Sequence, residues 1–138
     1  MLTDSRGSPS DPRGAAVSNI YGKGPKGKAT KLHAELVRSR GRCERCGSTW
    51  QLQCAHIISR RYSATRTDER NAWCLCATCH LFLGGHEFEH VEFALATIGA
   101  EVYAELRAKA YDNPRPWKQS MWEAEVVRLT ALLAEVNA

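Results

Sequence analysis

The sequence predicts a small α+β protein in which two short strands and a helix are held together by cysteines. Two C-x2-C pairs, Cys43–Cys46 and Cys76–Cys79, flank the segments of strand-like composition. Apolar residues recur at helical spacing over most of the C-terminal third. At 138 residues the chain has the length of one domain that buries a modest core without several disulfides.

The first 28 residues predict a flexible basic arm, because Gly, Pro, Ser and Lys dominate and few apolar residues offset the entropy of ordering. Residues 1–42 hold nine Lys or Arg against three acidic residues, so the net charge of +4 originates there. Such an arm is typical of proteins that bind a polyanion, and equally of a solubilising tail. The segment Thr30–Arg40 predicts a short basic helix that Gly41 ends.

The four paired cysteines predict a structural zinc site. The C-x2-C spacing brings two thiolates to one ion, and Gly47 suits the tight turn after the first pair. The chain has no apolar leader and no run of transmembrane length, so we expect a soluble, cytoplasmic protein whose thiols bind metal rather than form disulfides. Cys54 and Cys74 lie outside the pairs and are expected to be small buried side chains, whereas His33 is expected on the surface.

The segments Trp50–Ile58 and Asn71–Cys76 predict a two-stranded hairpin. Alternation along the first strand places His56 on the same face as Cys54. Residues 59–70 between the strands are expected to form a polar loop. The second cysteine pair then leads into a short helix that carries His80.

Residues 91–138 predict a helical extension. Its helices are separated by Gly99 and by a proline-containing linker at residues 113–116. The last helix has one apolar stripe, formed by Trp122, Val126, Leu129, Leu133 and Val136. The stripe predicts packing either within the chain or in a homodimer.

Three side chains in the cysteine-flanked region predict phosphodiester hydrolysis, which needs an activated water, a cation and a rigid frame. His56 is a candidate general base near neutral pH, and His80 follows Cys79 where it could bind a divalent ion. Asn71 can bond to the backbone of the loop and hold the His56 strand in place. The three residues together supply each part of the reaction.

The order Cys43-x2-Cys46, His56-Ile57-Ile58, Asn71, Cys76-x2-Cys79-His80 resembles the HNH, or ββα-metal, nuclease family. A wider resemblance, to phage HNH nucleases of the lambda Rap (NinG) recombination type, covers residues 29–138 and includes Ala55–Arg61 and Thr65–Asp68. It implies a DNA endonuclease that uses Mg²⁺ or Mn²⁺. It also implies, for the Rap branch, branched recombination intermediates as substrates and the host cytoplasm as location.

The resemblance divides the chain into the basic arm (1–28), a zinc-knuckle HNH nuclease core (29–90) and the helical extension (91–138). It implies His56, Asn71 and His80 as catalytic residues, with His80 and secondarily His86 holding the catalytic ion. The side chains expected to contact DNA are Lys23, Lys26, Lys28, Arg60, Arg61 and Arg66.

Ala55 departs from the family pattern, because many HNH sites place an Asp or His ligand directly before the base. Alternatively, His56 itself binds the metal and another group is the base. A non-catalytic zinc-knuckle DNA-binding protein is the alternative function. The residues that could replace the missing ligand are Asp68, His86, Glu87 and His90.

Overall fold

The structure is a computed structural model that describes residues 19–138. Its centre is a two-stranded antiparallel sheet of β1 (Leu52–His56) and β2 (Ala72–Cys76), which confirms the predicted α+β hairpin. The register pairs Cys54 with Cys74 and His56 with Ala72. Because side chains alternate across a strand, Cys54 and His56 lie on one face of the sheet, and Gln53 and Ala55 on the other.

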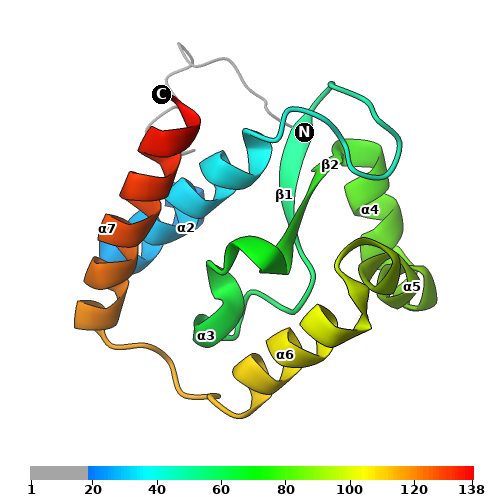
Figure 1. Cartoon of the computed structure of the whole chain (residues 1–138). Helices are drawn as coiled ribbons and strands as arrows, with labels where there is room; N and C mark the ends of the chain where they lie inside the picture. Colours follow the sequence, from blue (N-terminus) through cyan, green and yellow to red (C-terminus); the bar gives the residue numbers. More distant parts are fainter. Residues whose placement is uncertain (1–18) are drawn as a thin grey trace.

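Helices cover both faces of this hairpin (Figure 1). On the Cys54 face, α2 (Gly24–Arg38) packs its Val37 against Cys74. On the opposite face, α4 (Ala77–Gly85) and α5 (Glu87–Thr97) close over a core around Trp73. The hairpin is therefore the middle layer between two groups of helices.

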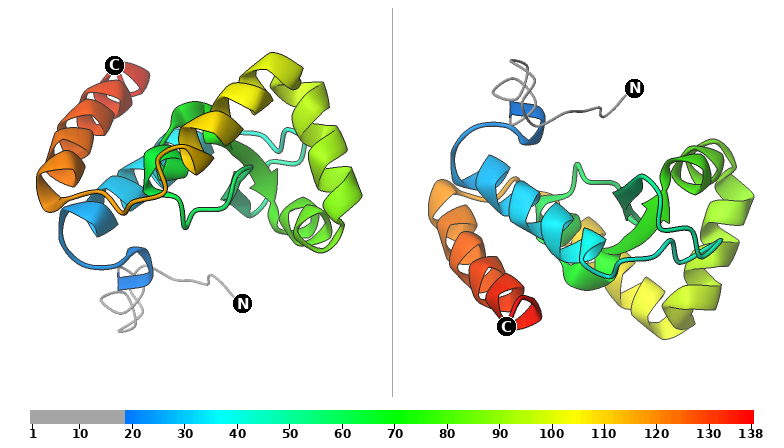
Figure 2. Two further views of the ribbon diagram at one scale, coloured as in Figure 1. Left: turned by 90° about the horizontal axis from the view of Figure 1, so that it is seen from below. Right: turned by 90° about the horizontal axis from the view of Figure 1, so that it is seen from above.

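The last helix, α7 (Gln119–Val136), lies alongside α2 at the end of the molecule away from α5 (Figures 1 and 2). Trp122 and Leu129 of α7 are buried together with Ala29 of α2. Most of the predicted apolar stripe is thus covered within the chain, whereas Val136 remains 51% exposed. A homodimer through the C-terminal helices stays a prediction.

Helix α6 (Gly99–Tyr111) joins the two ends of the molecule. Its Leu106 and Ala110 are fully buried and form a small core with Ile58, two residues beyond the end of β1. The linker after α6 then leads to α7. Within residues 19–138, each helix is too short or too polar to cross a bilayer.

Helix α2 begins at Gly24, earlier than the predicted start at Thr30, after a short 3-10 turn, η1 (Asn19–Tyr21). Pro25 stands in the first turn, where a missing N–H costs no hydrogen bond. Gly27 packs so closely on the backbone of Gly22 that a Cβ would clash. Residues 24–28 of the predicted arm are therefore helical, and residues 1–18 lie outside the described part of the chain.

The segment predicted as a polar loop, residues 59–70, contains two short helices, and half of its residues are buried. It contains α3 (Ser63–Arg66) and η2 (Glu69–Asn71), and residues 63–68 are all buried. Three of the polar residues, Arg66, Thr67 and Asp68, find side-chain partners on α2, α7 and α6. Thr67, for example, donates a hydrogen bond of 2.5 Å to Glu125 of α7.

Candidate functional site

The four paired cysteines converge, as predicted. Cys43 and Cys46 occupy the turn before β1, while Cys76 ends β2 and Cys79 lies in the first turn of α4. Their sulfur atoms all lie within 4.8 Å of one another, and those of Cys46 and Cys76 are 3.7 Å apart. A tetrahedral zinc site with bonds of about 2.3 Å requires sulfur separations of about 3.8 Å. The four thiols therefore have the donor chemistry and the spacing to hold zinc.

The groups around this cluster favour thiolates. The backbone amides of Cys46 and Cys79 each donate to the first sulfur of their own pair, over 3.5 Å. Arg45 lies 3.4 Å from the sulfur of Cys79 and also stacks over Phe82. Burial raises the pKa of Cys43, but hydrogen bonds from backbone amides outweigh that effect and lower the pKa to about 6. At Cys79, burial outweighs the contact with Arg45 and raises the pKa of the thiol to about 12.

Asn71 is fully buried and ties the end of β1 to the segment that follows it. Its Oδ1 accepts a hydrogen bond of 2.7 Å from the amide of Ile58. Its Nδ2 donates to the carbonyls of Ile58 and Thr65, at 3.0 and 2.9 Å. The Asn71 side chain thus bonds to the backbone of the loop, and within residues 19–138 its three hydrogen bonds are all to backbone groups.

His56 points toward α2 and lies beside His33 and Cys54. The two imidazole rings are 5.4 Å apart, and Nδ1 of His33 is 3.8 Å from the sulfur of Cys54. Nε2 of His56 lies 2.8 Å from the carbonyl oxygen of Arg66, which can only accept. Burial lowers the pKa of His56 to about 4, so the ring is neutral near pH 7.

His33 was expected at the surface, and that expectation was wrong. Its side chain is fully buried, and Nε2 lies 3.1 Å from the carbonyl oxygen of Asp68. A helical signal could have located it, because His33 stands four residues after Ala29 and four before Val37, both of which are buried. Cys54 is half-buried, as a small packed side chain would be, and burial raises the pKa of its thiol to about 12.

His80 belongs to the other face of the hairpin. Its Nδ1 lies 2.8 Å from Oε1 of Gln53, which alternates with Cys54 and His56 along β1. His56 and His80 are therefore not brought to one site. Within residues 19–138, two groups of three or more His, Cys, Asp or Glu ligand atoms approach one another, and neither includes His80.

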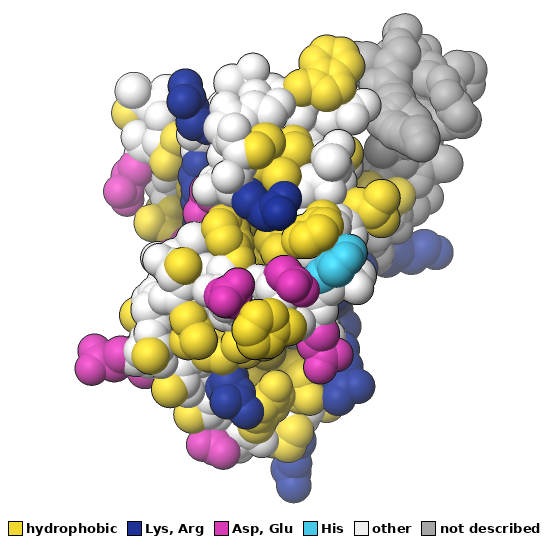
Figure 3. All heavy atoms as spheres, turned by 90° about the vertical axis from the view of Figure 1, so that its right-hand side faces the viewer, with side chains coloured by type: hydrophobic (Ala, Val, Ile, Leu, Met, Phe, Trp, Pro, Cys, Tyr) yellow, Lys and Arg dark blue, Asp and Glu magenta, His cyan; other side chains and the backbone are white. Residues whose placement is uncertain are grey.

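Two of the residues considered as replacement ligands, His86 and His90, pack on aromatic rings, and Glu87 is exposed in the first turn of α5. His86 is exposed, stacks on Phe82 and bonds to its carbonyl oxygen, and His90 packs edge-on against Trp73. Figure 3 shows the face of the molecule around α4 and α5, where apolar side chains are interspersed with charged ones. Phe88 is 71% exposed in this region.

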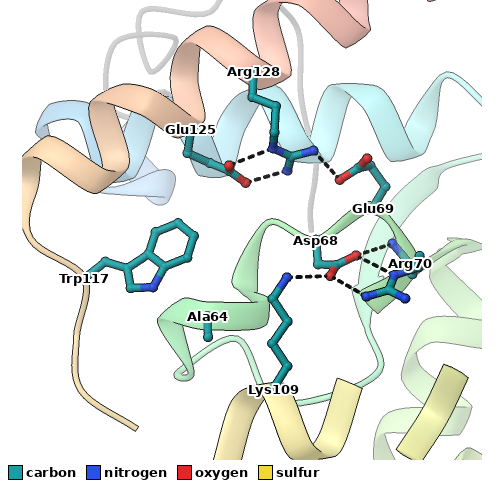
Figure 4. A pocket seen from close by; sticks show the side chains of 8 residues that line it. All are labelled: Ala64, Asp68, Glu69, Arg70, Lys109, Trp117, Glu125 and Arg128. Carbon is teal, nitrogen blue, oxygen red and sulfur yellow. Dashed lines mark hydrogen bonds and ion pairs between the residues drawn. The ribbon is translucent and has the colours of Figure 1, made fainter. Parts of the chain in front are cut away.

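Asp68 is paired with basic side chains and does not belong to a cluster of metal ligands (Figure 4). Arg70 and Lys109 pair with its carboxylate at 3.1 and 2.9 Å. Burial alone would raise the pKa of Asp68, but these hydrogen bonds outweigh it and hold the pKa well below its usual range. Beside it, Arg128 bridges Glu69 and Glu125, so the charges along this hollow of about 360 Å³ largely neutralise one another.

Four of the six predicted DNA-binding side chains line one hollow of about 300 Å³ at the N-terminus of α2. These residues are Lys23, Lys26, Arg60 and Arg66, and we call their surface the basic hollow. Arg66 is only 8% exposed and donates to Thr30 and to the carbonyl of Arg60. Within residues 19–138 no acidic side chain pairs with these four cations.

The other two predicted DNA contacts lie elsewhere. Arg61 is exposed and stacks over the ring of Tyr62, and Lys28 is exposed on α2 outside the hollow.

Comparison of the chain with protein-family models, with curated proteins and with solved structures finds no match.

Proposed function

We propose that this protein is a metal-dependent DNA endonuclease built on a zinc-stabilised hairpin. The observation that carries the proposal is the position of Arg66. Its guanidinium lines the basic hollow, while its backbone carbonyl accepts the hydrogen bond of His56. A phosphate held in the hollow would thus lie next to the segment that orients His56.

The basic hollow has the features of a phosphate site. Four cationic side chains surround it, and the first turn of the 15-residue helix α2 adds the positive end of a helix dipole. Lys23 at the N-cap makes no side-chain capping bond, so the amides of that turn are uncapped. Buried Arg66 supplies a planar donor that suits phosphate oxygens.

His56 is the candidate reactive group. On its face of the hairpin, the described residues form no set of ligands for Mg²⁺ or Mn²⁺. Neither group of converging ligand atoms among residues 19–138 contains a carboxylate, the ligand that either ion prefers. No residue among 19–138 is therefore assigned as a ligand of Mg²⁺ or Mn²⁺. His56 contributes as a proton acceptor or as a metal ligand.

A second candidate is a DNA-binding protein that uses zinc only for stability. The separation of His56 from His80 on opposite faces of β1 favours this alternative. Both candidates require the basic hollow, but only the endonuclease requires His56.

The test combines cleavage with binding. Wild type and His56→Ala would be incubated with supercoiled plasmid and with a four-way junction, in Mg²⁺, Mn²⁺ or Zn²⁺. We expect wild type to nick or cut and His56→Ala to lose cleavage while retaining DNA affinity and the near-UV circular dichroism of the folded core. Folded wild type that binds DNA but cleaves neither substrate would identify the zinc-stabilised binding protein.

Binding through the hollow is tested with a matched pair of lysines on α2. Lys26 lines the hollow, whereas Lys31 is exposed on the same helix outside it. Lys26→Ala should lower the slope of log affinity against log salt by about 1, and Lys31→Ala should leave it unchanged. Equal slopes for the two variants would exclude the hollow as the phosphate site.

A further inference from the structure

Three ligands from two distant segments meet on the α2 face of the hairpin. His33 comes from α2, and Cys54 and His56 come from β1. One ligand atom of each lies within 4.8 Å of the others. We propose that His33, Cys54 and His56 bind a second zinc ion, separate from the four-cysteine site.

The hydrogen bonds of the two histidines support this assignment. Nε2 of each ring faces a backbone carbonyl oxygen, that of Asp68 for His33 and that of Arg66 for His56. Because a carbonyl cannot donate, each Nε2 carries the proton and leaves a lone pair on Nδ1. Histidine ligands of metals characteristically donate their other N–H to a carbonyl or carboxylate in this way.

The available distance also agrees with coordination. Nδ1 of His33 and the sulfur of Cys54 are 3.8 Å apart. Zinc bonds of about 2.0 Å to nitrogen and 2.3 Å to sulfur give a tetrahedral nitrogen–sulfur separation of about 3.5 Å. Nδ1 of His56 has no hydrogen-bond partner within residues 19–138, so its lone pair is available.

The competing interpretation is a packed core in which the thiol of Cys54 donates weakly to His33. That arrangement uses one lone pair and leaves Nδ1 of His56 without a role. It also gives no reason why both imidazoles are oriented by backbone carbonyls of the same short segment. A soft thiolate and two imidazoles are a donor set that zinc prefers.

Binding at this site changes the chemistry of its residues. Both imidazoles enter as neutral ligands, and the Cys54 thiol loses its proton to solvent, so one proton is released per zinc bound. Three protein ligands leave a fourth position for water. His56 would then be a ligand rather than a general base, and the ion would fasten α2 to β1 directly.

Zinc stoichiometry tests the site without any DNA. The full chain would be loaded with zinc, freed of excess metal and analysed for bound zinc per chain. We expect two zinc ions in wild type, one in Cys54→Ala, and two in the control Cys74→Ala. Cys74 is a suitable control because it is the cross-strand partner of Cys54, is fully buried, and belongs to neither ligand group.

X-ray absorption of zinc-loaded wild type gives a result that does not depend on the folding of a variant. The four-cysteine site contains no imidazole, so imidazole scattering from tightly bound zinc would come from the second site. A single zinc per wild-type chain, a purely sulfur environment, or equal zinc loss in Cys54→Ala and Cys74→Ala would overturn the proposal. Loss of DNA cleavage alone would bear on the proposed function and not on this site.

Discussion

Replacing Asn71 with alanine removes three buried hydrogen bonds that tie the residues just after β1 to the segment beyond them. The buried amide accepts from Ile58 N–H and donates to the carbonyls of Ile58 and Thr65, all between 2.7 and 3.0 Å. Alanine is smaller and makes none of these bonds. One buried donor and two buried acceptors then lose their partner.

The size of the effect follows from these three bonds. A net contribution of about 1 kcal/mol for each gives a loss of about 3 kcal/mol, and the loss rises to about 6 kcal/mol when water cannot reach the abandoned groups. In a domain of this size a loss of about 3 kcal/mol lowers Tm by about 10 °C. Asn71 would thus be essential to the fold whether or not the protein cleaves DNA.

Urea unfolding of zinc-loaded protein measures this loss as a lower midpoint at unchanged slope. The control is Asn113→Ala, since Asn113 makes a single exposed bond to the carbonyl of Lys109. That variant should stay within about 0.5 kcal/mol of wild type. If Asn71→Ala and Asn113→Ala unfolded at the same urea concentration, the three buried bonds would not stabilise the hairpin.

Three further predictions concern the zinc site, an ion pair and the α2–α7 core. Cys46→Ala should lose the structural zinc and the near-UV circular dichroism of the core, and a folded, fully zinc-loaded variant would refute that role. The lowered pKa of Asp68 makes its stabilising effect complete above its unfolded-state value of about 4 and progressively lost below it. Asp68→Asn should therefore be less stable than wild type at neutral pH, and its stability should fall less steeply in acid. Parallel profiles of stability against pH, measured by urea unfolding, would contradict this. Leu129→Ala should lower the free energy of unfolding by about 2–5 kcal/mol, since Leu129 is fully buried. The exposed control Val127→Ala should lower it by under about 0.5 kcal/mol. Equal melting temperatures for the two variants would rule out the α2–α7 core.

The local patterns of the sequence predicted the hairpin and the cysteine cluster well. The C-x2-C spacing requires two thiols on one turn, and alternation along β1 correctly placed Cys54 and His56 on one face. The apolar stripe of α7 was also visible, although its partner helix α2 could not be chosen from periodicity alone.

The errors arose where burial depends on distant partners. The segment 63–68 is polar in composition, yet Thr67 and Asp68 are buried because α7 and α6 supply Glu125 and Lys109. His33 was misplaced for a similar reason, since its burial depends on the carbonyl of Asp68, 35 residues away. The separation of His56 from His80 likewise depends on a distant contact, that of His80 on α4 with Gln53 on the other face of β1.

The pairing of α2 with α7 determines when the chain can fold. Helix α2 is made early, but Ala29 and its neighbouring leucines remain uncovered until residues 119–136 have left the ribosome. Because these contacts join segments almost a whole domain apart, closing them is a late and comparatively slow event. All four paired cysteines precede α7 in the chain, so the metal site could be filled before α7 covers the helix that carries His33.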